Sequence, residues 1–303
     1  MQNASGLTQL PKFIYGTTRL GDDSIDFDER VKIAHYAMES CSWFHVSDQY
    51  GSAISVLAEA FKQKPDAIPK MIFKVEGESI EELRDVIQRN IEPLGVKHMD
   101  IGQLCLRGEL AEQYAQSGAC YQDIEQLRSE GVIKQFVKEV FPWSSEVTYQ
   151  ALKAGHDEQL VDGYIFYLNP LQRFALNPLW DLIQQKDKAV IAMRTVCGNT
   201  PQALRDVPGA AWKEYIQQRA VDIAPLFESS GIKNWADFCV GYALAHSQVQ
   251  ATVGSSARRE NIDALVNAAQ APTLIDDKIL KKITALHQQW SDSLDQHAEP
   301  WSM

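Results

Sequence analysis

Tyr50 and Lys74 are two residues whose types and spacing suit acid-base chemistry at one site. Tyr50 follows the short apolar run Trp43–Ser47, and Lys74 closes the next apolar run, Met71-Ile72-Phe73. If the two runs are neighbouring parallel strands, residues at their carboxyl ends face one site. A Lys ammonium beside a phenol favours the phenolate and lowers the phenol pKa from its usual value near 10. The pair therefore predicts a tyrosine that acts as a general acid near neutral pH.

Eight short apolar runs recur along the chain, and each is too short to form a helix. They cover Phe13–Thr17, Trp43–Ser47, Lys70–Val75, Asp100–Leu106, Ile133–Phe141, Gly163–Leu168, Ala189–Thr195 and Gln250–Gly254. Between them lie stretches whose apolar residues recur three and four apart, as an amphipathic helix needs. These stretches are Asp28–Ser40, Ser52–Gln63, Ser79–Glu92, Cys120–Glu130, Ser144–Ala154, Asn177–Gln185 and Ala236–His246. Strand and helix are thus expected to alternate along the chain.

Eight alternations in 303 residues, with no linker rich in Pro, Gly or Ser, predict a single (β/α)8 TIM barrel domain over residues 1–303. The active site of such a barrel lies at the carboxyl ends of its strands. A doubly wound open sheet is the main alternative, but no GxGxxG motif follows the first strand. Ser79 and Glu82 form a capping-box pattern, and Gly131 is expected to end the helix of the 120s.

Two segments exceed what a plain barrel needs. Thr200–Gly231, between the seventh and eighth strands, is longer than an ordinary connection. We expect a packed surface helix at Trp212–Phe227, and a loop that closes over a ligand is the alternative. Ile275–Leu294 continues with helical periodicity after the eighth unit, which predicts an extra C-terminal helix.

The composition is that of a globular protein, with 45% hydrophobic and 23% charged residues. A net charge of -11 argues against broad contact with nucleic acid or anionic membrane. The five cysteines have no zinc-like spacing with the histidines, so we expect free thiols and no metal site. Neither a signal-like N-terminus nor a long apolar stretch is present, and a cytoplasmic protein is expected.

Several short motifs, taken in order, resemble those of the aldo-keto reductase superfamily of NADP(H)-dependent (β/α)8 barrels. Gly16–Gly21 is similar to the first-strand GTxxLG motif, and His45–Gly51 is similar to DTAxxYG with His45 in place of the leading Asp. Lys74 falls on the family's catalytic lysine. The other similar pairs are Met99–Cys105 with DLxxLH, Gly131–Lys134 with GKIR, Asn169–Leu171 with YNPL, and Ala251–Ser256 with the stretch that leads into the adenosine-phosphate loop.

The resemblance implies reduction of a carbonyl, with Tyr50 as proton donor and Lys74 lowering its pKa. The family's Asp partner of the Lys and its carbonyl-orienting His correspond here to His45 and Cys105. For His45, donation to a carbonyl and a packed core role are both open. For Cys105, a small buried group is favoured over a nucleophile. Asp48 is expected either to reach Lys74 or to cap the following helix.

The resemblance also implies a site for NADP(H). Its members are Thr17, Thr18, Arg194, Gly198, Ser255, Ser256, Arg258 and Arg259. Arg258 and Arg259 open a predicted helix, where backbone N–H groups and guanidinium groups suit a phosphate, and a solvated basic pair is the alternative. Arg194 is expected inside the seventh strand with an anionic partner, which could be the cofactor phosphate, the substrate or Glu139.

The family's nicotinamide pocket is altered in this sequence. Its Ser-Asn pair, its sixth-strand Gln and its stacking Tyr correspond to Glu139-Val140, Ile165 and Met193. Val140 and Ile165 have no polar side-chain atoms and cannot supply amide hydrogen bonds. Glu139 either returns a carboxylate to the pocket or is a surface residue paired with Lys138.

Two functions follow from these observations. The leading hypothesis is an NADP(H)-dependent oxidoreductase of the aldo-keto reductase type that acts on a small-molecule carbonyl substrate. The second is a non-redox or inactive barrel of the same type that binds a small anionic metabolite, or a partner protein, without hydride transfer. An anionic substrate is open under the first hypothesis too.

Overall fold

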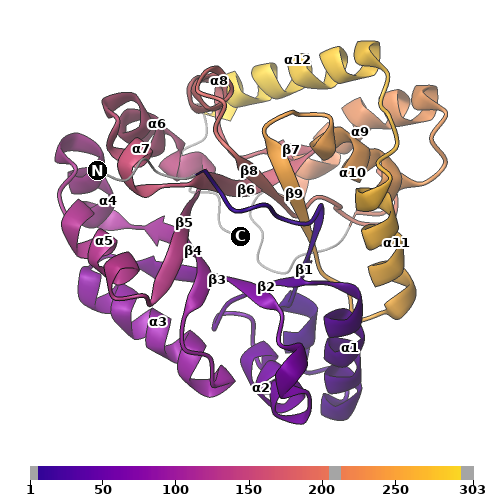
Figure 1. Ribbon diagram of the computed structural model, residues 1–303. Coiled ribbons are helices and arrows are strands. Elements are labelled where there is room, and N and C mark those ends of the chain that lie inside the picture. Colours follow the sequence, from indigo (N-terminus) through magenta and orange to yellow (C-terminus); the bar gives the residue numbers. More distant parts are fainter. Residues whose placement is uncertain (1–5, 205–212, 295–303) are drawn as a thin grey trace.

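The computed structural model describes residues 6–204 and 213–294, which form a closed barrel of parallel strands surrounded by helices (Figure 1). Each strand of the barrel pairs in parallel with the next, and β9 pairs back to β1. The predicted (β/α)8 fold is therefore confirmed. The strands of the barrel are β1 (Phe13–Gly16), β2 (Trp43–Val46), β3 (Lys70–Gly77), β4 (Met99–Leu106), β5 (Ile133–Glu139), β6 (Gly163–Asn169), β8 (Val190–Met193) and β9 (Val249–Gly254).

Helices cover the outside of the barrel (Figure 1). They are α1 (Phe27–Ser40), α2 (Ala53–Gln63), α3 (Ile80–Leu94), α4 (Gly108–Ser117), α5 (Tyr121–Ser129), α6 (Ser145–Ala154), α7 (His156–Leu160), α8 (Asn177–Gln185), α9 (Lys213–Ser230), α10 (Trp235–Leu244), α11 (Arg259–Gln270) and α12 (Asp277–Leu294). Helix α12 packs against α8 and α9, and it is the extra C-terminal helix that the sequence predicts.

The long connection before β9 contains α9, whose Ile216, Ala220 and Ile223 are buried. This confirms a packed helix over most of the predicted span, while Trp212 lies outside the described residues. Residues 1–5, 205–212 and 295–303 are also outside them, so the single domain over 1–303 stays a prediction. Within the described ranges, no helix has the length and apolar character to cross a bilayer, and no group of acidic, His or Cys side chains could hold a metal ion.

Local chemistry explains two of the helix boundaries. At the start of α3, the Ser79 hydroxyl accepts a hydrogen bond from the Glu82 N–H, and the Glu82 carboxylate accepts one from the Glu78 N–H. After α5, Gly131 has a φ of +75°, which glycine adopts without a Cβ penalty. The predicted capping sequence and the predicted stop are both confirmed.

Three elements and one boundary differ from the prediction. The sequence did not predict α4, α7 or the two-residue strand β7 (Gln172–Arg173) that pairs antiparallel with β6. Arg194 is not inside a strand, because β8 ends at Met193 and Arg194 follows it with a φ of +46°. The backbone turns at this residue, and the side chain leaves the strand register.

The inside of the barrel is filled by an apolar layer toward the amino ends of the strands. We use that name for Ile14, Trp43, Ile72, Ile101, Val137, Ile165, Ile191, Met193, Ala251 and Val253. Leu7 and Leu10 pack against this layer, and the Thr8 N–H donates to Gln135 Oε1 at 3.0 Å, so the N-terminal segment closes this end.

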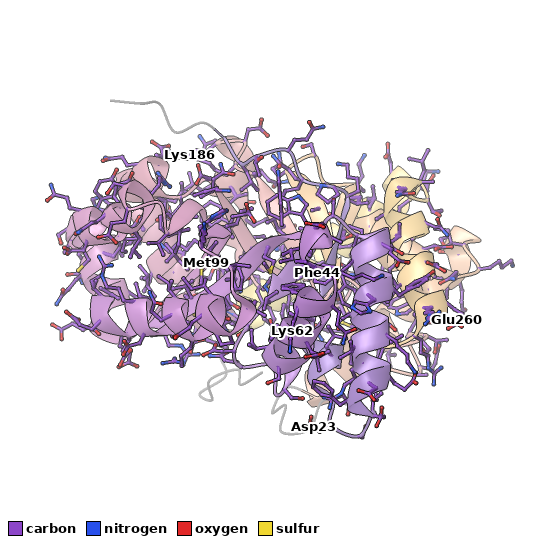
Figure 2. All side chains as sticks on the ribbon, turned by 60° about the horizontal axis from the view of Figure 1, so that its bottom comes forward. Asp23, Phe44, Lys62, Met99, Lys186 and Glu260 are labelled. Carbon is purple, nitrogen blue, oxygen red and sulfur yellow. The ribbon has the colours of Figure 1, made fainter. Side chains whose placement is uncertain are left out.

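A second, larger core lies between the strands and the helices. Figure 2 shows Phe44 and Met99 among the packed side chains, whereas Asp23 and Glu260 lie at the outline of the molecule. Phe44 and Met99 are fully buried. The helices are therefore held on the barrel mainly by apolar contacts.

Candidate active site

Four buried polar side chains face the barrel interior above the apolar layer, and we call them the polar layer: His45 of β2, Lys74 of β3, Gln103 of β4 and Glu139 of β5. Each follows an inward apolar residue by two positions, because alternate residues of a strand share a face. The polar layer therefore lies toward the carboxyl ends of the strands, where (β/α)8 barrels carry their chemistry.

The Lys74 ammonium is held by carboxylates from two strands. Its Nζ lies 3.0 Å from Glu76 Oε2 and 3.7 Å from Glu139 Oε2. The Lys74 side chain is 3% exposed and that of Glu139 is 2% exposed. Burial lowers the pKa of Lys74, but Glu139 and Glu76 raise it by more, so the lysine stays charged. The two carboxylates supply the partners that a buried ammonium requires.

Glu139 belongs to the interior and not to the surface. Lys138, its partner in the surface alternative, instead lies 3.0 Å from Asp157 (Nζ to Oδ1). Burial raises the pKa of Glu139, and Lys74 only partly offsets this. Among the described residues, Glu139 Oε2 accepts no hydrogen bond and Gln103 Nε2 donates none. Gln103 and Cys105 nevertheless face the Glu139 side chain, and their hydrogen bonding acts to lower its pKa.

Tyr50 contacts the polar layer through His45. Its hydroxyl lies 3.4 Å from His45 Nδ1, and His45 Nε2 lies 2.6 Å from Gln103 Oε1. Because the amide oxygen accepts from Nε2–H, Nδ1 is the acceptor for the Tyr50 hydroxyl. His45 therefore positions Tyr50.

The pKa of Tyr50 is shifted in the direction opposite to the one expected. Burial raises the pKa of Tyr50 well above 10, and the negative charge of Glu139 raises it further. The predicted lowering by Lys74 is thus corrected. The physical reasons are that the phenol is buried and that Glu139 places a negative charge near it, while Glu76 and Glu139 are the close ionic partners of Lys74.

His45 and Cys105 are both buried and uncharged. Burial lowers the pKa of His45 to about 4, and the Lys74 charge acts in the same direction. The family's anion is therefore replaced by a neutral imidazole. Burial raises the pKa of the Cys105 thiol, as does Glu139, which supports a small buried group over a nucleophile.

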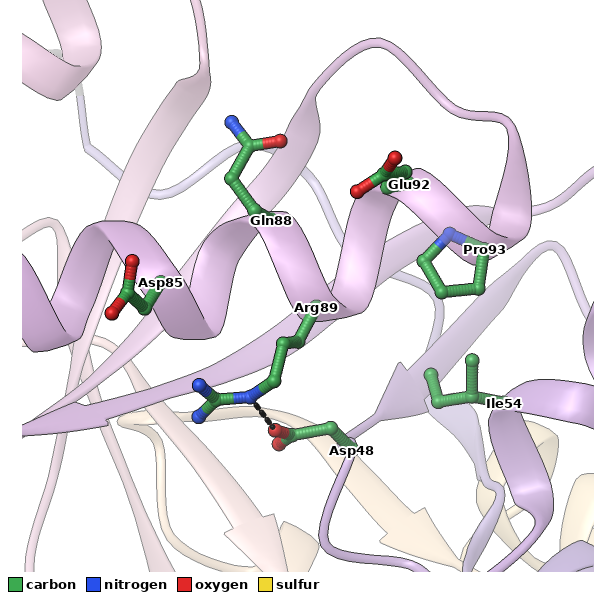
Figure 3. Close-up of a pocket in the computed structure, with 7 residues that line it drawn as sticks. All are labelled: Asp48, Ile54, Asp85, Gln88, Arg89, Glu92 and Pro93. Carbon is green, nitrogen blue, oxygen red and sulfur yellow. Dashed lines mark hydrogen bonds and ion pairs between the residues drawn. The ribbon is translucent and has the colours of Figure 1, made fainter.

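Asp48 neither reaches Lys74 nor caps the next helix. Its carboxylate lies 3.0 Å from Arg89 Nε of α3, outside the barrel (Figure 3). The pocket there is lined by Asp48, Ile54, Asp85, Gln88, Arg89, Glu92 and Pro93. Both alternatives for Asp48 are wrong, because the loop after β2 turns this residue toward α3.

An aromatic wall, which sequence reasoning missed, adjoins the polar layer. Lys74 Nζ lies 5.6 Å from the ring centroid of Phe141, and Trp143 stacks on Phe141 with centroids 4.4 Å apart. Tyr167 stacks on Phe174 at the same centroid distance of 4.4 Å. Trp143 is 45% exposed, so the wall extends from the buried lysine to the surface.

The residues expected at the cofactor site lie at the carboxyl ends of β1, β8 and β9. The Thr17 hydroxyl donates to the His45 carbonyl oxygen at 2.9 Å, and Thr18 hydrogen-bonds to Tyr50. Ser255 Oγ accepts from the Arg19 N–H at 2.9 Å, which joins the loop after β9 to the loop after β1. Thr18 is therefore brought into contact with Tyr50, and the loops that carry the expected threonines and serines are joined to each other.

The basic residues of that site fall in three different places. The Arg194 guanidinium lies 5.4 Å from the Tyr167 ring centroid, and Gly198 follows with a φ of +92°. Arg258 is exposed at the N-terminus of α11, and its N–H donates to Ser256 Oγ at 3.1 Å. Arg259 lies over the Tyr36 ring at 5.2 Å, toward α1.

Comparison with known proteins assigns the family. The sequence model of the aldo/keto reductase family matches residues 12–288. The chain belongs to the aldo/keto reductase family. No curated protein matches it.

Solved aldo/keto reductases have the same fold. One from Klebsiella pneumoniae, in complex with NADP and acetate, is 18% identical with a TM-score of 0.68, over 97% of this chain and 95% of that chain. The holo form of an aldo-keto reductase from Bacillus halodurans is 18% identical with a TM-score of 0.69, over 94% of this chain and 95% of that chain. A Klebsiella pneumoniae aldo-keto reductase in complex with NADPH is 16% identical with a TM-score of 0.67, over 97% of this chain and 95% of that chain.

For an aldo/keto reductase, this polar layer has an unusual charge arrangement. The position of the family's Asp holds a neutral His45, and the carboxylates near Lys74 come from Glu76 and Glu139. Alternation along β3, β4 and β5 would have placed Glu76, Gln103 and Glu139 on the inward face. That signal could have found Glu76 and Gln103, which the sequence motifs missed.

Proposed function

We propose that this aldo/keto reductase uses NADP(H) to reduce a small carbonyl substrate, with Tyr50 as the proton donor. The observation that carries the proposal is the position of the Tyr50 hydroxyl. Tyr50 is partly exposed as a residue, and its hydroxyl lies 3.4 Å from Nδ1 of buried His45, which Gln103 holds in turn. A substrate that enters between the mouth of the barrel and the polar layer would therefore lie within reach of the phenol.

The chain offers fitting residues for both ends of the cofactor. No side chain caps the N-terminus of α11 within the described residues, and exposed Arg258 lies beside Ser256 there, which suits a phosphate. At the barrel centre, Glu139 and Gln103 hydrogen-bond weakly to each other, and their carboxylate and amide groups match the donor and acceptor of a carboxamide. When bound, the reduced cofactor supplies a hydride.

Tyr50 acts as a neutral phenol. Because its pKa is raised, Tyr50 stays protonated at neutral pH, and His45 Nδ1 holds its hydroxyl in place. The phenol transfers its proton as the carbonyl oxygen gains negative charge. Proton donation leaves Tyr50 as a phenolate, which burial and Glu139 disfavour, so the phenol must regain a proton before the next turnover.

Cofactor titration followed by a substrate panel tests this function. We expect micromolar NADPH binding by thermal shift, and reduction of at least one member of a panel of aldehydes and ketones. Tyr50→Phe should lower kcat/KM by about 100-fold or more and leave the NADPH Kd within twofold of wild type. Tyr149→Phe, on the outer helix α6, is the matched control and should change neither value.

Two results would overturn the proposal. Absence of NADPH binding at millimolar concentration would remove the redox function, and unchanged turnover in Tyr50→Phe would remove Tyr50 from the mechanism.

Binding of a small anionic metabolite without hydride transfer is the second candidate. It is favoured by Arg107 and Arg194, which are partly exposed at the carboxyl ends of β4 and β8, and by Val140 and Ile165, which are apolar and fully buried. A thermal shift with small carboxylates or phosphates, combined with no response to NADPH, would support this function instead.

A further inference from the structure

The centre of the barrel holds more negative than positive buried charge. The side chains of Lys74, Glu139 and Glu76 are 3%, 2% and 11% exposed, which gives one cation and two carboxylates. Arg107, which contacts Glu76 Oε1 at 2.5 Å, is 45% exposed and largely solvated. Glu76 therefore has close contacts with both Lys74 and Arg107, and Glu139 has the longer contact of 3.7 Å.

Glu139 is placed to receive a positively charged group. It is the last residue of β5 and follows the inward Val137 by two positions. Its buried Oε2 has no close hydrogen-bond partner among the described residues, with Lys74 Nζ 3.7 Å away and only weak hydrogen bonding from Gln103 and Cys105 to the carboxylate. Phe141 of the aromatic wall follows Glu139 by two positions and lies 5.6 Å from Lys74 Nζ, and aromatic faces attract cations. A carboxylate next to aromatic rings in a region of low dielectric constant favours a planar cation over a neutral ring.

The oxidised and reduced forms of the nicotinamide cofactor differ in the charge of the nicotinamide ring. The oxidised ring carries a positive charge and the reduced ring is neutral, while their phosphates and adenosine are the same. Contacts at the phosphate end therefore cancel in the ratio of the two dissociation constants, and the ratio reports the charge at the ring.

We propose that Glu139 makes this barrel bind NADP⁺ more tightly than NADPH. The inference rests on the proposed function, because it assumes that the cofactor binds in the barrel. Glu139 acts on the bound ring through charge, and it replaces a neutral family residue. By stabilising the charged ring, it also favours release of hydride from the reduced form.

Isothermal titration of the full chain with each form of the cofactor tests this inference. In wild type we expect the Kd of NADP⁺ to be about tenfold lower than that of NADPH. Glu139→Gln keeps the shape and removes the charge, so the ratio should approach one. Glu139→Asp keeps the charge and should retain a preference for NADP⁺. Asp48→Asn, outside the barrel, should leave the wild-type ratio unchanged within twofold.

The possible failures are distinguishable. A wild-type ratio near one, or a tenfold preference that persists in Glu139→Gln, would overturn the role of Glu139 while the proposed function stands. If neither form binds at millimolar concentration, the proposed function falls and the inference falls with it. Because the wild-type ratio is itself decisive, the test holds even if Glu139→Gln does not fold.

Discussion

The apolar layer and the polar layer come from the same strands and differ by a step of two residues. Ile72 precedes Lys74, Ile101 precedes Gln103, and Val137 precedes Glu139, so each pair shares a face and differs only in depth. The apolar layer has no polar side-chain atoms to satisfy except the Trp43 N–H. The polar layer has a compensated lysine and a buried carboxylate and amide that hydrogen-bond only weakly to each other. The amino end of each strand thus contributes mainly to stability, and the carboxyl end carries the polar groups that could bind a ligand.

Removing the buried cation of the polar layer should have the largest effect on both stability and turnover. In Lys74→Met, Glu76 and Glu139 are left as buried carboxylates without their ammonium, and we expect a loss of about 3–5 kcal/mol in the free energy of unfolding. Turnover should disappear. Chemical denaturation measures the stability, and Lys74→Met/Glu139→Met should recover part of it. A single variant as stable as wild type would mean that Lys74 and Glu139 do not form an ion pair.

A cavity in the apolar layer should affect stability alone. Ile101→Ala should lower the free energy of unfolding by about 3 kcal/mol, because it deletes buried methyl and methylene groups. The NADPH Kd should stay within twofold of wild type. Gln103→Leu on the same strand is the matched variant, and it should cost less stability and weaken cofactor binding more. If both variants weaken binding equally, the two layers do not act separately.

Acid should weaken the polar layer gradually. Burial lowers the pKa of His45 to about 4, so the unfolded chain binds more protons than the native protein between about pH 6.5 and 4. Stability conferred by neutral His45 is present at pH 7 and is lost as the pH falls through that window, by roughly 1 kcal/mol per pH unit. His246, outside the barrel, also has its pKa lowered to about 4 and should act in the same direction.

Denaturation curves at pH 7, 6 and 5 measure this effect. His45→Gln and His246→Gln should each give a smaller loss of stability with acid than wild type. A pH dependence in His45→Gln that is parallel to wild type would contradict a neutral, buried His45.

The sequence predicts the barrel well because the patterns that mark strands and helices each lie within a short stretch of the chain. Strand positions follow from short apolar runs, and the observed strand bounds lie close to the predicted ones. Helix α4 was missed because it begins at Gly108, almost directly after β4, where no turn signal separates the two elements. The boundary at Arg194 was missed because its positive φ is atypical of a non-glycine residue.

The sequence identifies several residues of the candidate site, but it does not predict the pKa shifts that these residues impose on one another. Tyr50, Lys74 and His45 are recognised from motif order, and alternation places Glu139 inward. The pKa of Tyr50 was expected to fall, and it rises because the phenol is buried and lies near the charge of Glu139, while Glu76 and Glu139 compensate Lys74. Those distances depend on the register between β3, β4 and β5, which no local sequence pattern contains.

The pairing of β1 with β9 has a consequence for the order of folding. The Tyr15 hydroxyl donates a 2.8 Å hydrogen bond to the Ser256 carbonyl oxygen, 241 positions away in the chain. The Arg19 N–H likewise donates to Ser255 Oγ at 2.9 Å. A chain emerging from the ribosome must therefore wait for its last strand before the barrel can close, and β1 keeps an unpaired edge until then. Closure and assembly of the loop at Ser255 and Ser256 are one event, so a refolding chain should complete the proposed phosphate site only in its final kinetic phase.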